Sequence, residues 1–455
     1  MSFNFIMKNS KKPLVKKDGA AFEDGRAYLL KGGRSLSGEV AVSGAKNAAT
    51  KQLVAALLAD EPVILNNVPD IGDVRATLDM LRELGVGVEF ANNRAVIDGR
   101  KLKTSEVAEA LTRKNRIPIL LLGPLLHRFG EARIPALGGC QIGPRPVNIH
   151  LDGLAQMGAD ISNEDGYFVA RAKRLKAAMI ELSFPSVGAT ENLILAAVKA
   201  KGTTVIANAA VEPEILDTAK LLQSMGAIIN LETNRTWVIE GVEKLHGAEH
   251  TVLSDRIEAA SFGIAAALTK GSIFVKHARQ DDMLSFLNAI RRVGVPFKVE
   301  QDGILFGSAD NYRPVVLETD THPGFMTDWQ QPFVMLLTQA KGVSIVHETI
   351  FEDRFGYTET LVKMGAHIQL HSDCLGSKNC RFKHKNFMHS CIVSGPTPLT
   401  AADVCIPDLR AGFSYLLAAL MAKGESRVTG VGIIERGYED IIGKLQKLGA
   451  DIKVG

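Results

Sequence analysis

A run of glycine and proline around one cysteine is the part of this sequence best suited to chemistry. Residues 137–148 hold three glycines and two prolines, together with Cys140 and Arg145. Neither a helix nor a central strand tolerates that composition, so we expect a surface loop. A cysteine near fixed positive charge is biased toward the reactive thiolate. Taken alone, a single cysteine is more often an inert apolar residue packed under a turn. Whether Cys140 is reactive must therefore be judged from the rest of the chain.

Lys46 is a second candidate, because it follows the strand-like residues 40–43 at the point where we expect a helix to begin. A lysine in the first turn of a helix opposes the helix dipole. That conflict indicates a lysine serving an outside group, such as an anion near exposed N–H groups. A solvated surface lysine is the equally weighted alternative.

Four arginines stand where a fixed side chain is expected. The planar guanidinium matches carboxylate and phosphate, so several copies converging on a cleft would bind a small polyanion. Each one alone is more often a salt-bridge partner. They are Arg116 before the apolar run 117–122, Arg145 between two prolines, Arg410 at an expected helix start, and Arg436 within residues 435–439.

Asp328 lies in a turn that leads into an expected helix running to Leu337. That position suits an N-cap, whose side chain accepts hydrogen bonds from the first helical N–H groups. The alternative is a general base at the mouth of a cleft.

Residues 371–400 contain several histidines and cysteines close together in the sequence. Because zinc is bound by these residue types, we considered a zinc site. The residues are His371, Cys374, Cys380, His384, His389 and Cys391. No Cys-x-x-Cys pair occurs, and the intervals fit no familiar zinc template. We therefore favour a basic surface loop and expect no metal; stoichiometric zinc in the purified protein would contradict that preference.

These residues must be positioned by a chain that repeats one pattern six times. An amphipathic helix ends in a hydrophobic residue and a glycine suited to the left-handed C′ position, and a short strand follows. An alanine- and leucine-rich helix precedes another strand in each unit. Successive glycines lie 68 to 73 residues apart except for the last interval of 84, which indicates an insertion at roughly residues 372–400. They are Gly85, Gly158, Gly226, Gly294, Gly365 and Gly449.

Six such units predict an α/β fold of two pseudo-symmetric domains, each with three helix–strand repeats, and a ligand cleft between them. A chain of 455 residues is also longer than a domain with a single hydrophobic core usually is. We place a basic tail at residues 1–25, one discontinuous domain at 26–45 plus 254–455, and the other at 46–253, with the Cys140 loop (136–148).

Composition excludes several function classes. The net charge of +3 is too small and diffuse for nucleic-acid binding, and no apolar stretch reaches the roughly 18 residues of a membrane span. Five cysteines, an odd number, without a secretory signal favour a reducing cytoplasm. We expect no obligate protein partner.

Eight stretches, in order, resemble the UDP-N-acetylglucosamine 1-carboxyvinyltransferase family, and the resemblance covers nearly everything after residue 30. They are residues 36–49, 138–143, 145–147, 186–190, 255–258, 327–328, 408–411 and 436–439. The resemblance implies two inverted α/β domains, inside-out barrels with the active site between them. It implies transfer of the enolpyruvyl group of phosphoenolpyruvate to the 3′-hydroxyl of UDP-N-acetylglucosamine, releasing phosphate, as the first committed step of peptidoglycan synthesis. No cofactor or metal is implied.

The resemblance also implies roles for the matched residues. Cys140 would be the general acid, Asp328 would take or position the hydroxyl proton, and Lys46 would also be catalytic. Phosphoenolpyruvate would be held by Lys46, Asn47, Arg116, Arg145, Arg410 and Arg436, with Asp408 in support. The nucleotide sugar would be lined by Arg116, Arg145, Pro146, Val147, Asn148, Ile149, Ser186, Val187, Gly188, Asp328 and Ile350.

Acid and base fall in different expected domains, so we expect domain closure to join Cys140 with Asp328 and to exclude water. Asn148 stands where the family usually has aspartate, which removes a charge from the nucleotide side. An enolpyruvyl transferase acting on another uridine nucleotide, such as UMP, is therefore the alternative. The Gly-Gly-Cys loop argues against the shikimate-type branch. The presence of Cys140, Lys46 and Asp328 together argues against a non-catalytic scaffold.

Overall fold

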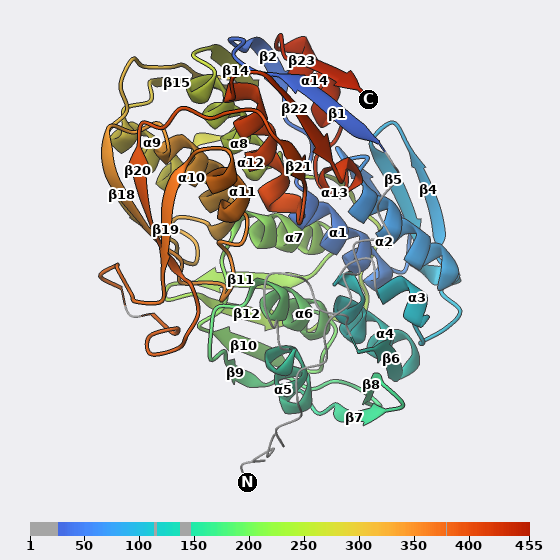
Figure 1. The fold of residues 1–455 in the computed structure, drawn as a ribbon. Coiled ribbons are helices and arrows are strands. Elements are labelled where there is room, and N and C mark those ends of the chain that lie inside the picture. The colour runs from blue at the N-terminus through green and yellow to red at the C-terminus, as the bar shows by residue number, and fades with distance from the viewer. Residues whose placement is uncertain (1–25, 113–115, 137–146, 379) are drawn as a thin grey trace.

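The computed structural model describes residues 26–112, 116–136, 147–378 and 380–455. Three predicted site residues, Cys140, Arg145 and Pro146, lie outside the described residues. The described chain forms an α/β fold, as the sequence predicted, and small sheets surround its central helices (Figure 1). No helix of the described part is long and apolar enough to cross a membrane.

Six small sheets share one strand pattern. In five of them an edge strand pairs parallel with its neighbour, and two further strands follow in antiparallel register. In the sixth, a single parallel bridge between Glu106 and Arg133 stands in place of the parallel edge strand. The sixfold repeat of the sequence therefore appears as a sixfold repeat of sheet topology.

The sheets divide into two groups of three. The first group comprises β2 (Ser37–Ala41), β14 (Ser272–Lys276), β16 (Gly303–Phe306) and β15 (Phe297–Glu300); β17 (Val316–Glu318), β18 (Gly342–His347), β20 (Ser390–Gly395) and β19 (His367–His371); and β21 (Asp403–Cys405), β22 (Glu425–Thr429), β1 (Ala27–Lys31) and β23 (Asp451–Val454). The second group comprises β13 (Glu249–Thr251), β3 (Val63–Asn66), β5 (Arg94–Asp98) and β4 (Gly87–Ala91); β9 (Met179–Glu181), β10 (Thr203–Ala207), β12 (Thr236–Glu240) and β11 (Ile228–Glu232); and β6 (Glu131–Pro135), β8 (Tyr167–Arg171) and β7 (Asp160–Glu164).

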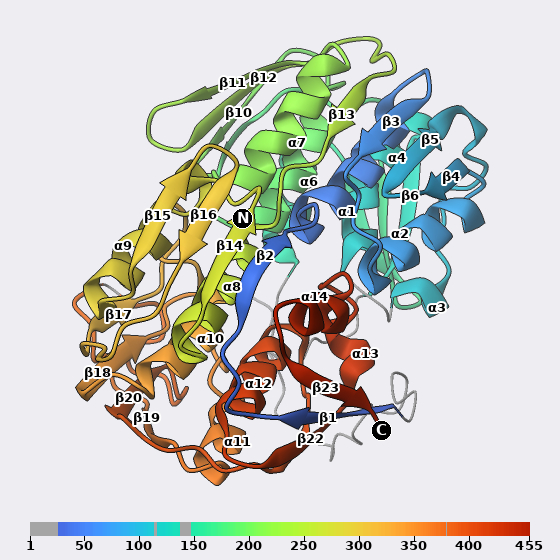
Figure 2. The same ribbon diagram turned by 90° about the horizontal axis from the view of Figure 1, so that it is seen from above.

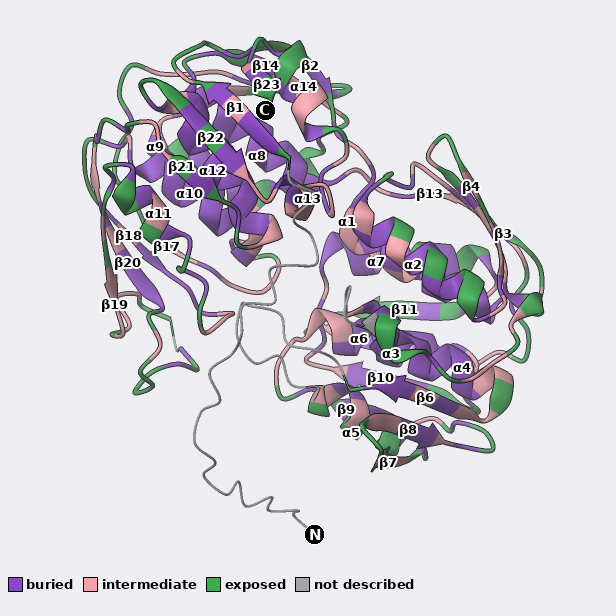
Figure 3. Cartoon of the chain, turned by 45° about the vertical axis from the view of Figure 1, so that its right-hand side comes forward, coloured by how far each residue is buried: buried purple, intermediate pink, exposed green. Residues whose placement is uncertain are grey.

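Central helices fill the space inside the sheets (Figure 3). Three of them, α6, α8 and α12, are rich in alanine and leucine, a composition that suits burial on all sides. Every residue of two of them, α8 and α10, is buried. The six are α1 (Lys46–Ala55), α4 (Leu122–Phe129), α6 (Val187–Ala197), α8 (Arg256–Leu268), α10 (Gln330–Leu337) and α12 (Leu409–Met421).

A second helix completes each repeat and ends as the sequence predicted. These helices are α2 (Gly72–Glu83), α5 (Asn148–Gln156), α7 (Pro213–Ser224), α9 (Leu284–Val293), α11 (Thr358–Lys363) and α14 (Ile441–Lys447). All six predicted closing glycines have φ between 88° and 111°, the left-handed region that favours glycine. Short segments are α3 (Glu109–Thr112), α13 (Val431–Ile434), η1 (Ala56–Leu58), η2 (Gly99–Lys101), η3 (Ile117–Leu121), η4 (Gln280–Asp282) and η5 (Thr327–Trp329).

Buried hydrophobic residues form two separate clusters. One lies within residues 28–42 and 257–452, and the other within 45–252. The chain therefore passes between the clusters twice, near residues 43–44 and 253–256. Figure 2 shows β1 between β22 and β23, which joins the first described strand to the last strand of the chain. The domain limits expected from the sequence lie close to these two passages and stay a prediction.

The expected insertion is shorter than predicted. Residues 390–395 form β20, which pairs with β18 and β19 as in the other repeats. The additional chain is therefore the β19–β20 loop, residues 372–389. The equivalent connections β4–β5, β7–β8 and β11–β12 are tight turns that contain asparagine or aspartate at positive φ, as hairpin turns require.

Candidate active site

One segment of the first core docks on the second core. The backbone N–H of Gly72 donates to the carbonyl of Glu435 at 3.0 Å, and that of Asp73 donates to the carbonyl of Arg436 at 3.2 Å. Both donors belong to the first turn of α2, where N–H groups have no partner within the helix. The docking brings the Arg436 side chain beside the start of α2.

Asp73 holds two of the predicted site cations. Its carboxylate lies 2.9 Å from Lys46 Nζ and 2.9 Å from Arg436 Nε. Burial lowers the pKa of Lys46, while Asp73 opposes that change. Burial would raise the pKa of Asp73, but Lys46 and Arg436 together bring it below its usual value. Lys46 is the first residue of α1, as predicted, and its charge serves a group outside that helix.

Asp328 joins two guanidinium groups. Its oxygens lie 2.5 Å from Arg354 Nη2 and 3.1 Å from Arg410 Nε. Asp328 is in the short η5 turn, and Trp329 occupies the N-cap of α10. The N-cap interpretation of Asp328 is therefore wrong, because its carboxylate faces arginines from two distant segments.

Arg410 is fixed at the start of α12, as predicted. The Asp408 side chain caps this helix by accepting hydrogen bonds from the N–H groups of Arg410 and Ala411. Burial would lower the pKa of Arg410, but Asp328 raises it. Its Nη1 atom is buried and has no hydrogen-bond partner among the described residues. A buried guanidinium N–H of this kind is suited to an anionic ligand.

The two ion-pair groups form one cluster, which we call the anion cluster: Lys46, Asp73, Asp328, Arg354, Arg410 and Arg436. The charge of Arg410 lies close enough to Lys46 to help lower its pKa. Four cationic side chains share two carboxylates in these pairs. Such a cluster can bind a small polyanion.

Two further predicted phosphoenolpyruvate residues, Asn47 and Arg116, belong to segments that contact each other. Asn47 follows Lys46 in α1, and its carbonyl accepts a hydrogen bond from Lys51 Nζ at 2.6 Å. Arg116 is half-buried at the N-terminal end of η3, which leads into α4.

Two predicted nucleotide-sugar segments meet at the N-terminal ends of neighbouring helices. Val147 precedes α5, whose first two residues are Asn148 and Ile149, and Asn148 is exposed. Ser186 caps α6 by accepting a hydrogen bond from the Ala189 N–H at 3.4 Å, and Val187 begins that helix. The two ends are in contact, because a Cβ at Gly188 would lie 3.2 Å from the His150 ring.

Arg381, which was not among the predicted site residues, connects Ile350 with a predicted nucleotide-sugar segment. The Ile350 carbonyl accepts a hydrogen bond from Arg381 Nη2. The same guanidinium lies 4.5 Å from the centre of the Phe184 ring, two residues before Ser186. Arg381 belongs to the β19–β20 loop of the first core, whereas Phe184 lies in the part of the chain that forms the second.

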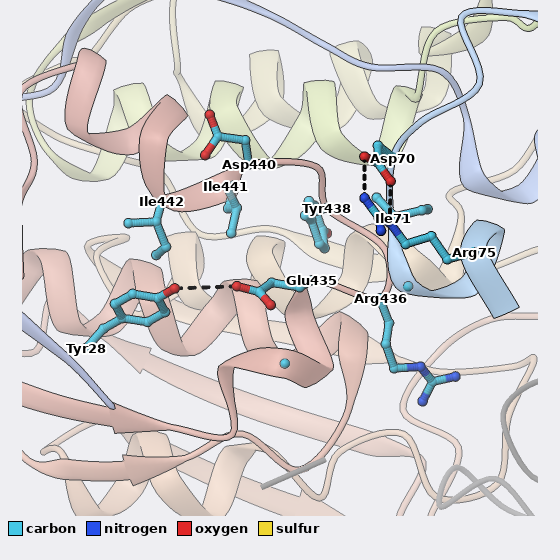
Figure 4. A pocket seen from close by; sticks show the side chains of 12 residues that line it. Tyr28, Asp70, Ile71, Arg75, Glu435, Arg436, Tyr438, Asp440, Ile441 and Ile442 are labelled. Atoms are coloured by element: carbon cyan, nitrogen blue, oxygen red, sulfur yellow. Dashed lines mark hydrogen bonds and ion pairs between the residues drawn. The ribbon is translucent and has the colours of Figure 1, made fainter. Parts of the chain in front are cut away.

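A cavity of about 410 Å³ opens along the docked segment (Figure 4). Arg436 lines it together with Ile71, Tyr438 and the ion pair of Asp70 with Arg75. In Figure 4 the Arg436 side chain points away from that ion pair. Of the predicted site residues that the structure describes, Arg436 alone lines this cavity, so it borders the anion cluster rather than containing it.

Sequence reasoning missed three residues that hold the site together. Asp73 resembles any acidic residue in a first helical turn, which the helix dipole alone explains. Arg354 and Arg381 lie in loops without a pattern. Only their contacts, with Lys46, Asp328 and Phe184, distinguish them.

Comparisons with known proteins show which family the chain resembles. The family model of EPSP synthase (3-phosphoshikimate 1-carboxyvinyltransferase) matches residues 30–445. A UDP-N-acetylglucosamine 1-carboxyvinyltransferase from Protochlamydia amoebophila is 49% identical over 93% of this chain and 93% of its own. A UDP-N-acetylglucosamine 1-carboxyvinyltransferase from Halothermothrix orenii is 44% identical over 94% of this chain and 99% of its own.

Solved structures show the same fold. The enolpyruvyl transferase NikO from Streptomyces tendae superimposes with a TM-score of 0.84 at 25% identity, covering 94% of this chain and 99% of its own. An EPSP synthase from Acinetobacter baumannii superimposes with a TM-score of 0.73 at 18% identity, covering 94% of this chain and 100% of its own.

Proposed function

This chain belongs to the UDP-N-acetylglucosamine 1-carboxyvinyltransferase family, and we propose that it transfers the enolpyruvyl group of phosphoenolpyruvate to the 3′-hydroxyl of UDP-N-acetylglucosamine, releasing phosphate. The observation that carries the proposal is the convergence of Lys46, Arg410 and Arg436, from three distant segments, on two carboxylates. The names of the relatives supply the acceptor. This reaction would open peptidoglycan synthesis, in the cytoplasm.

The anion cluster suits phosphoenolpyruvate because that ligand carries a phosphate and a carboxylate on the same carbon atom. Lys46, Arg410 and Arg436 would donate to its oxygens, and the buried Arg410 Nη1 offers one donor without a competing partner among the described residues. Asp73 and Asp328 hold the cations in place before the ligand arrives. Fixed donors of this kind stabilise charge without reorganising during the reaction.

Transfer requires an acid and a base. The hydroxyl oxygen of the sugar bonds to C2 of phosphoenolpyruvate while C3 gains a proton, which forms a tetrahedral adduct. Loss of a proton from C3 and departure of phosphate then restore the double bond. Cys140, outside the described residues, would donate the proton to C3 in keeping with the family resemblance. Asp328 would take or position the hydroxyl proton, held in orientation by Arg354 and Arg410.

The acceptor would bind where α5 and α6 begin. Helix N-termini carry unpaired N–H groups and partial positive charge, which suits a diphosphate. Asn148 supplies no charge at this position, so recognition would depend on the N–H groups and on Arg116 and Arg145.

An acceptor assay tests the proposal. The purified chain is incubated with phosphoenolpyruvate and either UDP-N-acetylglucosamine or UMP, and phosphate release is measured. We expect release with the sugar nucleotide; activity with UMP alone would contradict the acceptor assignment. Cys140→Ala should abolish release, whereas Cys140→Asp should retain part of it, because a carboxylic acid can still donate a proton. Full activity of Cys140→Ala would remove the general-acid role.

A further inference from the structure

Four potential metal ligands meet at the end of the sheet β17–β18–β20–β19. They are His347, Cys374, Cys380 and His389, and one ligand atom from each lies within 4.8 Å of the other three. Both histidines are fully buried, and Cys374 Sγ lies 3.3 Å from His389 Nε2. These residues, which we call the Cys/His cluster, lie outside the anion cluster and have no role in the proposed reaction.

Hydrogen bonds orient both imidazoles toward the centre of the cluster. His389 Nδ1 lies 2.7 Å from the carbonyl oxygen of Phe387, and His347 Nδ1 lies 3.1 Å from Glu318 Oε2. An acceptor at Nδ1 fixes the proton there and leaves Nε2 with a lone pair. His347 Nε2 is buried with no hydrogen-bond partner among the described residues. An unpaired buried nitrogen beside two thiols is the arrangement that a metal ion would complete.

Register and close packing build this arrangement. Glu318 and His347 are paired neighbours on the parallel strands β17 and β18, and His347 lies opposite Ser390 on β20. The loop passes directly over the first pair, since a Cβ at Gly376 would lie 2.1 Å from Glu318 Oε2 and 2.3 Å from His347 Nδ1. Only glycine fits there.

We propose that His347, Cys374, Cys380 and His389 bind one structural zinc ion, which fixes the β19–β20 loop. Two thiolates and two imidazoles in a closed four-ligand set are the donors of structural zinc sites, and soft thiolate ligands disfavour magnesium and calcium. Binding would convert both thiols to thiolates and release two protons to solvent. The N–H of Phe382, which donates to Cys380 Sγ at 3.4 Å, would support the negative charge on that sulfur.

The zinc-bound loop would in turn position Arg381, one residue after Cys380. That guanidinium contacts the Ile350 carbonyl and the Phe184 ring, so it spans two segments proposed to border the nucleotide sugar. Loss of zinc should therefore weaken acceptor binding more than it slows chemistry. This consequence rests on the proposed function, whereas the metal site itself does not.

Metal content of the full chain is the first test. We would purify the protein without a metal-binding tag and measure zinc by mass spectrometry, expecting about one ion per chain for a four-ligand site. Cobalt added to the metal-depleted protein should give the visible absorption of tetrahedral cobalt–thiolate. A wild-type chain with neither zinc nor that cobalt spectrum, or one with a Cys374–Cys380 disulfide, would overturn the proposal.

Matched variants then assign the ligands. Cys374→Ser and Cys380→Ser should lose zinc and the cobalt spectrum, whereas His384→Asn in the same loop and Cys405→Ser on an exposed strand should keep both. Equal loss in the two controls would overturn the assignment. Because wild-type zinc is measured directly, a variant that fails to fold does not decide the question.

Kinetics of the wild-type chain tests the role of the loop. Zinc removal should raise the KM for UDP-N-acetylglucosamine about tenfold and leave kcat within about twofold, and added zinc should reverse the change. An unchanged KM in a chain that lost its zinc would refute the role in positioning Arg381. A chain with zinc but no transferase activity would refute only the proposed function.

Discussion

The anion cluster and the Cys/His cluster both bury groups that can carry charge, but they satisfy those groups in different ways. In the anion cluster, Asp73 and Asp328 each contact two cationic side chains. In the Cys/His cluster, His347 Nε2 has no partner among the described residues, and the four ligand atoms face one another. The first cluster therefore has counter-charges supplied by the protein, whereas in the second the proposed zinc ion would supply the counter-charge to two thiolates.

That difference indicates what each cluster does. Ion pairs that already exist keep repelling cations together in the absence of ligand, and an incoming anion can share their donors without a large rearrangement. A cluster of two thiols and two imidazoles gains its stability from the bound ion instead. The anion cluster also joins the two hydrophobic cores, as expected for a catalytic site, while the Cys/His cluster lies at one sheet of a single core.

The largest effect is expected from removing a cation of the first cluster. Lys46→Ala should lower kcat/KM for transfer on the order of 10³-fold, because a fixed donor to the ligand is lost and Asp73 keeps only one of the two ion-pair partners described here. Steady-state phosphate release measures this change. Lys298→Ala, at an exposed surface pair, is the control and should leave activity unchanged. A loss of less than tenfold in Lys46→Ala would place Lys46 away from the ligand.

Asp328→Asn tests whether a carboxylate of the anion cluster also acts in chemistry. We expect kcat to fall about 10²-fold, because the amide cannot accept the hydroxyl proton, and the melting temperature to fall as well, because the buried Arg354 and Arg410 lose the counter-charge they share. Rapid-quench kinetics and thermal melting separate the two readouts. Asp79→Asn, at an exposed pair with Arg82, serves as the matched control. An unchanged kcat in Asp328→Asn would reduce this residue to a structural ion-pair partner.

Glu318→Gln tests whether the Glu318 carboxylate orients the His347 ring in the Cys/His cluster. The variant should bind zinc about 10- to 100-fold more weakly, because an amide orients the His347 ring less well than a carboxylate does. Competition with a chromogenic chelator measures the affinity. Glu300→Gln, a strand-end substitution on β15, should bind zinc like the wild type. Equal affinity of wild type and Glu318→Gln would exclude the carboxylate from orienting the ring.

Glu191 is intermediate between the paired carboxylates of the anion cluster and the unpaired His347 nitrogen of the Cys/His cluster. Its carboxyl oxygens are buried and have no hydrogen-bond partner among the described residues, but Lys51 Nζ lies 3.9 Å away. Burial raises the pKa of Glu191 to about 7, although Lys51 pulls it downward. The folded chain thus keeps a proton that the unfolded chain releases near its ordinary value of 4.5. Folded-state stability therefore falls as pH rises through that window.

Glu191→Gln should remove this pH dependence. Relative to wild type, the variant's free energy of unfolding should increase by roughly 2 kcal/mol between about pH 5 and about pH 8, with little effect on transfer. Urea unfolding at both pH values measures the difference. Glu359→Gln, an exposed residue of α11, should follow the wild type. Parallel curves for wild type and Glu191→Gln would show that Glu191 does not titrate in this range.

The fold could be predicted in large part from the sequence because its signals are local. Each closing glycine needs only its own positive φ, and each central helix needs only its apolar composition. The start of α1 at Lys46 and the start of α12 beside Arg410 followed from the same short-range reasoning. The length of the insertion was wrong, because residues 390–395 form β20, and their pairing with β18 and β19 is not visible in a local stretch of sequence.

The partners of the site residues were decided by the tertiary structure alone. Asp73 and Arg436 are 363 residues apart, and Asp328 and Arg410 are 82 apart, so no pattern in a local window relates them. The expectation of no metal stays a prediction. It considered only the histidines and cysteines between positions 371 and 391, whereas the folded chain also brings His347 to Cys374 and Cys380. Sequence thus determined which residue types were available and which helices begin beside them. Strand register and the meeting of two cores decided which charges face each other, because those contacts depend on chain segments that only folding brings together.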